Sequence, residues 1–189
     1  MNDLMRYAAS LEGAGERPLP PVETWNPDFS GDSDMVIRRD GTWFHEGAPI
    51  NRARLVRLFS SILRREDDDH FLVTPVEKLA ITVEDSPFIA VLMRVEGDGD
   101  GRKLIFTTNL GDEAVAGCEH PIRMRKDPET NEVTPYIDIR CGLEARIARA
   151  VFYDLVELGE RRHIDGKELF GLASGDDFFS FGEAHEIFG

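Results

Sequence analysis

The stretch GAPINRARLVRLFSSILRREDDD, residues 47–69, carries five arginines within a chain that is acidic elsewhere. Its apolar residues recur at the spacing of one face of a helix, which predicts an amphipathic helix over about residues 50–65. Gly47 and Pro49 precede this helix, and the acidic residues 66–69 follow it, where negative charge disfavours continuation of a helix. The stretch therefore predicts a helix with one apolar face and one basic face.

The arginines of this predicted helix divide by the face that they occupy. Arg52 falls beside the apolar face at the amino-terminal end, where a guanidinium group needs a partner. It either forms a buried ion pair, with Glu77 or Asp85 as candidates, or it faces a ligand, because a bidentate donor at a helix amino terminus suits a carboxylate or a phosphate. The remaining four fall on the solvent side and are interpreted as ordinary surface residues: Arg54, Arg57, Arg64 and Arg65.

Strand patterns flank the helix. Residues 35–39 and 42–46 alternate around Asp40-Gly41, a dipeptide that is typical of a tight hairpin turn. After the helix, FLVTPVEK (71–78) and LAITVED (79–85) predict two further strands, the first at an edge or a bulge because of its proline. The Ser86-Pro87 pair then predicts a boundary between two units.

The second half predicts strands around a second helix. Residues 88–96 and 102–110 indicate a long hairpin closed by GDGDG, and residues 122–127 and 132–140 indicate another. A helix follows over about residues 143–158. GDGDG resembles part of a calcium loop, but it joins strands and has Thr107 where an EF-hand needs glutamate, so a hairpin turn is preferred. The last segment is rich in Gly and Phe, and we expect its rings to pack on the body.

These patterns predict the α+β class, with two small units that each combine antiparallel strands and an amphipathic helix. We expect a tail or strap at residues 1–21, an N-terminal unit at 22–85 and a C-terminal unit at 86–189. A faint repeat connects the units, because placing Phe59 over Phe152 also places Trp43 over Tyr136. Such spacing also arises by chance, so the pattern leaves duplication open.

Composition narrows the function classes. The chain has 22 Lys and Arg against 36 Asp and Glu, a net charge of -14, which argues against binding nucleic acid through its phosphates. No apolar run approaches the roughly 20 residues of a membrane-spanning helix, and no secretory signal is recognisable, so we expect a cytoplasmic protein that does not bind membranes. Cys118 and Cys141 are too few for a disulfide framework, and we expect free, buried thiols.

No catalytic or nucleotide-binding motif is recognisable. The compact trio Cys118-Glu119-His120 would need a distant fourth donor to hold zinc, and the histidines are scattered. No set of nucleophile, base and orienting group can be assembled. We therefore expect no metal site and no cofactor, and we regard an enzyme as less favoured than a binding protein.

Several segments together resemble a bacterial family of unknown function, domain-of-unknown-function family 1285. The resemblance rests on DGTWFHEGAPINRARLVRLFSSILRRE (40–66), FLVTPVEK, ITVEDSPF (81–88) and YIDIRCGLEARIARAVFYDL (136–155). It implies an α+β fold with an internally repeated motif, whose second half is similar to pleckstrin-homology-like domains. It also implies a ligand site at the interface of the two halves, for a nucleotide-like molecule, and a role in signalling.

We therefore expect a binding module that holds a small anionic, nucleotide-like ligand between its two units, with Arg52 as the anchor. The predicted ligand-binding residues supply positive charge or a ring for stacking: Arg52, Lys78, Arg140, Arg149, Trp43 and His45. The alternative is an adaptor that contacts a partner protein through an exposed sheet edge or the Phe-rich tail.

Overall fold

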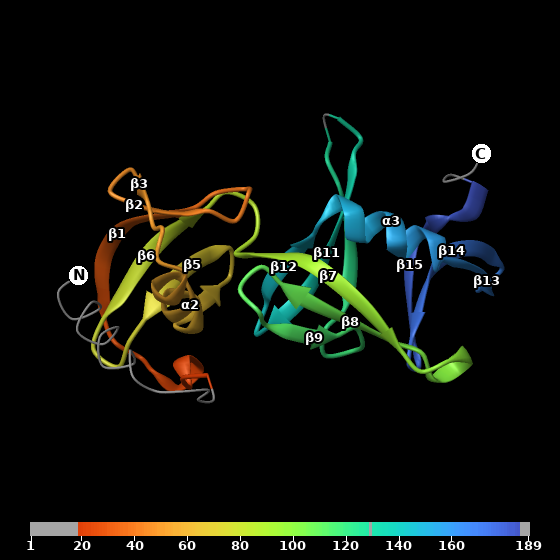
Figure 1. Ribbon diagram of the computed structural model, residues 1–189, viewed down its shortest axis with the longest axis horizontal. Coiled ribbons are helices and arrows are strands. Elements are labelled where there is room, and N and C mark those ends of the chain that lie inside the picture. Colours follow the sequence, from red (N-terminus) through yellow and green to blue (C-terminus); the bar gives the residue numbers. More distant parts are fainter. Residues whose placement is uncertain (1–18, 129, 186–189) are drawn as a thin grey trace. The chain divides into compact units, whose positions relative to one another are not determined.

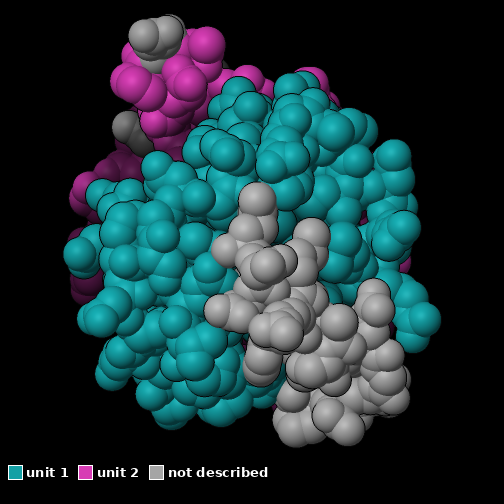
Figure 2. Space-filling model, turned by 90° about the vertical axis from the view of Figure 1, so that its left-hand side faces the viewer, with its two compact units in different colours: residues 1–87 teal, residues 88–189 magenta. Residues whose placement is uncertain are grey.

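The structure is a computed structural model that describes residues 19–128 and 130–185 (Figure 1). The chain forms two compact units, residues 1–87 and 88–189, which Figure 2 distinguishes by colour. Most of the predicted tail or strap, residues 1–18, lies outside the described residues. Within the described part of the chain, no helix is long and apolar enough to cross a membrane.

The first unit is built on one six-stranded sheet with the order β3-β2-β1-β6-β5-β4. Strands β1 and β6 pair in parallel, and the other neighbours pair antiparallel. In chain order its elements are η1 (Val22–Thr24), β1 (Phe29–Ile37), β2 (Trp43–His45), β3 (Ala48–Pro49), α2 (Ala53–Ser61), β4 (Leu63–Glu66), β5 (Asp69–Val73) and β6 (Lys78–Val83).

The second unit contains a six-stranded sheet with the order β10-β11-β12-β7-β8-β9 and a three-stranded sheet with the order β13-β14-β15. Strands β12 and β7 pair in parallel. In chain order its elements are β7 (Phe88–Glu96), η2 (Gly99–Gly101), β8 (Lys103–Thr108), β9 (Glu113–Val115), β10 (Ile122–Lys126), β11 (Val133–Arg140), β12 (Leu143–Ile147), α3 (Arg149–Glu157), β13 (Glu160–Ile164), β14 (Lys167–Ser174) and β15 (Asp177–Glu183).

Both units contain the same run of elements: three strands, a helix and three more strands. The run is β1-β2-β3-α2-β4-β5-β6 in the first unit and β10-β11-β12-α3-β13-β14-β15 in the second. Trp43 and Tyr136, which the sequence repeat matched, are both buried, in β2 and β11. The α+β class and the duplicated arrangement are therefore confirmed. The pleckstrin-homology-like character of the second half is not confirmed, since three strands follow α3.

Both helices are shorter than predicted, because strand pairing overrides helical periodicity at their ends. Helix α2 ends at Ser61, and residues 63–66 form β4, where Leu63 pairs with Leu72 of β5. Residues 143–147, expected to begin the second helix, form β12 and pair with β7. Apolar residues that suit a helix also suit a strand that is buried on both faces.

The Asp40-Gly41 turn agrees with the sequence pattern, whereas the single strand expected over residues 71–78 is wrong, because a turn divides it. At Asp40-Gly41, the N–H of Arg38 donates to the carbonyl of Thr42 at 2.9 Å, and Gly41 has a φ of 80°. Between β5 and β6, the N–H of Thr74 donates to the carbonyl of Glu77 at 2.9 Å. Pro75 therefore lies in this turn and not within a strand, so its missing N–H interrupts no ladder.

Two further expectations concern side-chain burial. Cys118 and Cys141 form no disulfide and are exposed, so the prediction that they are buried is wrong. Cys141 has a φ of 46° in the turn between β11 and β12, where its side chain leaves the sheet. In the Phe-rich segment, the Phe181 ring lies 5.9 Å from that of Phe170 and 6.2 Å from that of Phe152, so this ring packs on its own unit.

Candidate functional site

A bulge in β1 distorts the first sheet. In the parallel ladder, Asp32 pairs with Ala80 and Val36 pairs with Thr82, so residues 32–36 of β1 span only residues 80–82 of β6. The surplus residues leave the regular ladder and increase the local twist. Asp34, at the centre of the bulge, has a φ of 52°, a conformation that aspartate tolerates better than most residues.

Ser33 supplies the hydrogen bonds that the bulge removes from the ladder. Its buried hydroxyl donates to the carbonyl oxygen of Ala80 at 2.9 Å and accepts the N–H of Met35 at 3.3 Å. Because buried backbone groups need partners, this side chain stabilises an irregular strand inside the sheet. The bulge is thus a defined part of the fold.

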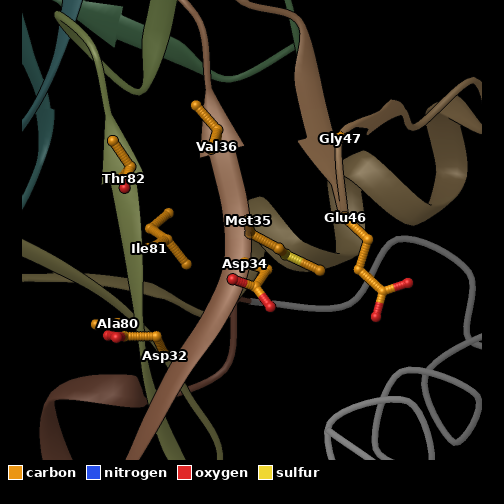
Figure 3. Close-up of a pocket in the computed structure, with 9 residues that line it drawn as sticks. All are labelled: Asp32, Asp34, Met35, Val36, Glu46, Gly47, Ala80, Ile81 and Thr82. Atoms are coloured by element: carbon orange, nitrogen blue, oxygen red, sulfur yellow. The ribbon is translucent and has the colours of Figure 1, made fainter.

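A cavity of about 500 Å³ lies at this bulge, with walls from β1, the turn between β2 and β3, and β6 (Figure 3). This volume falls within the range of small-molecule sites. Both acidic and apolar side chains line it: Asp32, Asp34, Glu46, Met35, Val36 and Ile81.

The cavity is acidic. Asp34 and Glu46 come from adjacent backbone segments, because the N–H of Glu46 donates to the carbonyl of Asp34 at 3.3 Å. Of the described residues that line the cavity, three carry carboxylates and none carries a basic group. Such a site repels anions and favours a cation or a hydrogen-bond donor. Among the described residues, no group of three or more His, Cys, Asp or Glu side chains is placed to hold a metal ion.

Arg52 lies outside this cavity. It is exposed at the residue before α2, in an extended backbone conformation, and its side chain does not cap the helix. The alternative of a buried ion pair with Glu77 or Asp85 is therefore wrong. Whether Arg52 binds a ligand stays a prediction.

The buried arginine of this segment is Arg64, which the sequence pattern placed on the surface. Its side chain is only 7% exposed, and it forms an ion pair with Glu66. Its Nη1 donates to the carbonyl oxygens of Val22 at 3.1 Å and Trp25 at 2.6 Å. The prediction failed because Arg64 belongs to β4, where its direction follows the sheet and not the helix. Through these two hydrogen bonds, Arg64 connects the segment around η1 to the sheet.

The other predicted residues of the first unit also lie outside the cavity. Lys78, in β6, donates from Nζ to Glu66 at 2.9 Å. Trp43 is buried, and its ring stacks on Phe59 with the centroids 6.4 Å apart. His45, at the end of β2, is half-buried. Lys78 and Trp43 therefore already have structural partners.

Arg140 and Arg149 belong to the second unit. Nη1 of Arg140 lies 2.6 Å from Oδ1 of Asp112, and its guanidinium group lies over the ring of Phe88. Arg149 is exposed at the first residue of α3, and its Nε donates to the hydroxyl of Tyr153 at 3.0 Å. A site that joins these residues to Arg52 stays a prediction.

The acidic residues of the cavity were missed at the sequence level. The run Gly31-Asp32-Ser33-Asp34 has low strand propensity, so the strand was expected to begin only at residue 35. The available signal was the presence of two aspartates directly before an apolar strand. It could not identify a cavity, because the bulge depends on the register with β6, which is distant in the chain.

Comparison with known proteins identifies the family. A family model described as "Domain of unknown function (DUF1285), N-terminal domain" matches residues 20–86, and "Protein of unknown function (DUF1285), C-terminal domain" matches residues 87–181. The chain therefore belongs to the DUF1285 family. No curated protein matches it.

Two solved structures are similar to this chain. A DUF1285 family protein from Silicibacter pomeroyi DSS-3 is 50% identical, with a TM-score of 0.87 and 98% of each chain covered. A DUF1285 family protein from Shewanella baltica OS155 is 29% identical, with a TM-score of 0.51, and the match covers 65% of this chain and 90% of that one. Both similarities support the same fold and name no activity.

Proposed function

We propose that this DUF1285 family member is a non-enzymatic binding module, whose N-terminal unit holds a small organic cation in the cavity at the β1 bulge. The observation that carries this proposal is the set of three carboxylates around a cavity of about 500 Å³ without a basic side chain in its described lining. An ammonium or guanidinium group would satisfy these carboxylates through charge-assisted hydrogen bonds.

The apolar part of the lining limits the rest of the ligand. Val36 and Ile81, both half-buried, supply hydrocarbon surface beside the carboxylates, and the buried Met35 lies behind them. A compact amine with a short alkyl chain would place its charge near Asp34 and Glu46 and its chain against this surface. The signalling role that the family resemblance implies would then consist of reporting the level of such an amine.

The cavity does not suit the anionic, nucleotide-like ligand expected from the sequence, because its carboxylates would repel a phosphate. Lys78 and Arg140 already form ion pairs with Glu66 and Asp112, so an anion would compete with these carboxylates. The exposed cations Arg52 and Arg149 keep that prediction open for a different part of the molecule.

An adaptor role through the Phe-rich segment has less support. The Phe181 ring packs on Phe170 and Phe152, and the Arg162 guanidinium group lies 4.8 Å from the centre of the Phe178 ring. Phe178 and Phe181 are half-buried and contribute to their own unit, which leaves less of their surface for a partner protein.

Thermal-shift and calorimetric titrations with putrescine and agmatine test the proposal, with inorganic phosphate and ATP as anionic comparisons. Amines should raise the melting temperature in a saturable manner, and the double variant Asp34→Asn, Glu46→Gln should lose this response. The matched control, Glu23→Gln with Asp28→Asn, removes equal charge at exposed positions outside the cavity and should keep it. Equal responses of the two double variants would refute the amine site.

A further inference from the structure

A second charged cluster lies in the C-terminal unit, on one face of β10, β11 and β12. The register places Arg123 opposite Tyr136 and Asp138 opposite Glu144. Directly opposed residues share a face, and alternate residues of a strand return to it. Arg125 therefore lies on the same face as the other four, and this cluster is independent of the cavity in the first unit.

The centre of the cluster is a buried carboxylate that contacts two exposed arginines. The side chain of Glu144 is 5% exposed, whereas those of Arg123 and Arg125 are 58% and 47% exposed. Nη1 of Arg123 lies 3.3 Å from Oε1 of Glu144, and Nη2 of Arg125 contacts Oε2. A buried carboxylate needs such partners, and each of its oxygens has its own arginine.

This arrangement leaves guanidinium N–H groups directed to solvent. Each guanidinium group has five N–H donors, and the contacts with Glu144 engage one terminal nitrogen of each arginine. Arg125 is further oriented by the ring of Tyr136, whose centre lies 4.3 Å from its guanidinium carbon. Arg146, opposite Tyr136, also lies on this face, so three arginines face the two carboxylates of Glu144 and Asp138 and leave positive charge on a protein of net charge -14.

Asp138 adds a second carboxylate to this face, opposite Glu144. Burial raises the pKa of Asp138, and the nearby carboxylate of Glu144 raises it further. The side chain therefore binds a proton more readily than an ordinary aspartate. On the other side, Nδ1 of His120 lies 3.1 Å from the carbonyl oxygen of Asp138, which ties the histidine to the same strand.

We infer that Arg123 and Arg125 bind a tetrahedral oxyanion, namely the phosphoryl group of a small molecule. Glu144 holds the two guanidinium groups close together, so one anion can contact both. A planar carboxylate has two oxygens, which a single guanidinium group already satisfies in the bidentate geometry. A phosphoryl group offers further oxygens in a second plane and can accept hydrogen bonds from both arginines.

The test is a titration of the full chain, followed through the Nε–H resonances of arginine side chains in ¹H–¹⁵N NMR spectra. Inorganic phosphate, methyl phosphate and acetate are compared at constant ionic strength. The resonances of Arg123 and Arg125 should shift in a saturable manner with both phosphates, and more weakly with acetate. Tighter binding of methyl phosphate would identify a phosphate ester as the recognised group, and tighter binding of inorganic phosphate would identify the free anion.

Variants separate specific binding from general charge attraction. Arg123→Gln and Arg125→Gln should each weaken phosphate binding by about ten-fold or more, the loss of one charge-assisted contact. Arg161→Gln is the control, because Arg161 is also exposed in this unit and forms a surface ion pair with Glu168 at 3.5 Å. Non-saturable shifts, or equal losses in all three variants, would overturn the inference. Because the wild-type titration needs no substitution, a variant that fails to fold leaves the test intact.

Discussion

The carboxylate of Glu66 in β4 lies 2.9 Å from the ammonium group of Lys78 in β6, across the intervening strand β5. The same carboxylate pairs with Arg64, whose other contacts are the carbonyl oxygens of Val22 and Trp25. One acidic side chain therefore connects two strands and, through Arg64, the segment around η1. This network connects parts of the first unit and is structural.

We predict that Arg64→Met reduces the free energy of unfolding by about 2–4 kcal/mol, because it removes the guanidinium donor to the carbonyl groups of Val22 and Trp25 and one partner of Glu66. Chemical denaturation of the full chain measures this change. Arg57→Met, in the exposed part of α2, is the control and should change stability by less than about 0.5 kcal/mol. Equal effects of the two substitutions would show that the contacts of Arg64 are dispensable.

The stability of the first unit should decrease in acid through Glu66. The hydrogen bond from Lys78, and then the contact with Arg64, lower the pKa of Glu66 below its ordinary value of 4.5. Because the folded state lowers this pKa, the pairing stabilises the fold above pH 4.5 and is lost as the pH falls through the folded pKa. Denaturation at several pH values should show a shallower loss for Glu66→Gln than for the wild type. Parallel curves would contradict this assignment.

The contribution of Asp138 to stability should depend on pH with the opposite sign to that of Glu66. Its pKa is raised above 3.8 by burial, so its charged form disfavours folding, and this cost grows as the pH rises from 3.8 through the folded pKa. Asp138→Asn should therefore stabilise the second unit by a fraction of a kcal/mol at pH 7. The difference from the wild type should vanish near pH 3, as measured by melting temperature. A difference that does not vary with pH would point to packing instead of titration.

Gly171 should tolerate no side chain. A Cβ atom at this residue of β14 would lie 2.3 Å from the backbone carbonyl oxygen of Phe179 in the neighbouring strand. Gly171→Ala must separate β14 from β15, and we expect a loss of at least about 1–3 kcal/mol. Gly117→Ala is the matched control, since its Cβ would have its nearest contact at 3.5 Å. If both variants have the melting temperature of the wild type, β14 and β15 are not packed as closely as described.

Features that depend on neighbouring residues were predictable from the sequence. The Asp40-Gly41 turn follows from the tolerance of this dipeptide for positive φ, and the apolar run at residues 88–93, followed by GDGDG, indicated β7. The match between Trp43 and Tyr136 indicated a duplicated arrangement but left it open, and the run of elements shared by the two units confirms it. In each case the determining contacts are close in the chain, or the pattern recurs in both units.

Features that depend on pairing between distant segments were not predictable. The helical pattern predicted that Arg64 faces solvent. This was wrong, because Arg64 lies in β4 and pairs with Phe71 of β5. The cavity depends on the register between residues 32–36 and 80–82, which no local pattern specifies. Similarly, the ion pairs of Arg123 and Arg125 with Glu144 depend on the pairing of β12 with β11, which no local pattern specifies.

The first and last strands of the repeated run pair with each other in the first copy but not in the second. In the first copy the opening and closing strands, β1 and β6, form the parallel ladder whose bulge creates the cavity. Their counterparts in the second copy, β10 and β15, belong to different sheets, since β10 pairs with β11 and β15 pairs with β14. The second copy therefore cannot form an equivalent amine site. The proposed amine site therefore predicts a stoichiometry of one amine for each chain, although the same run of elements occurs twice.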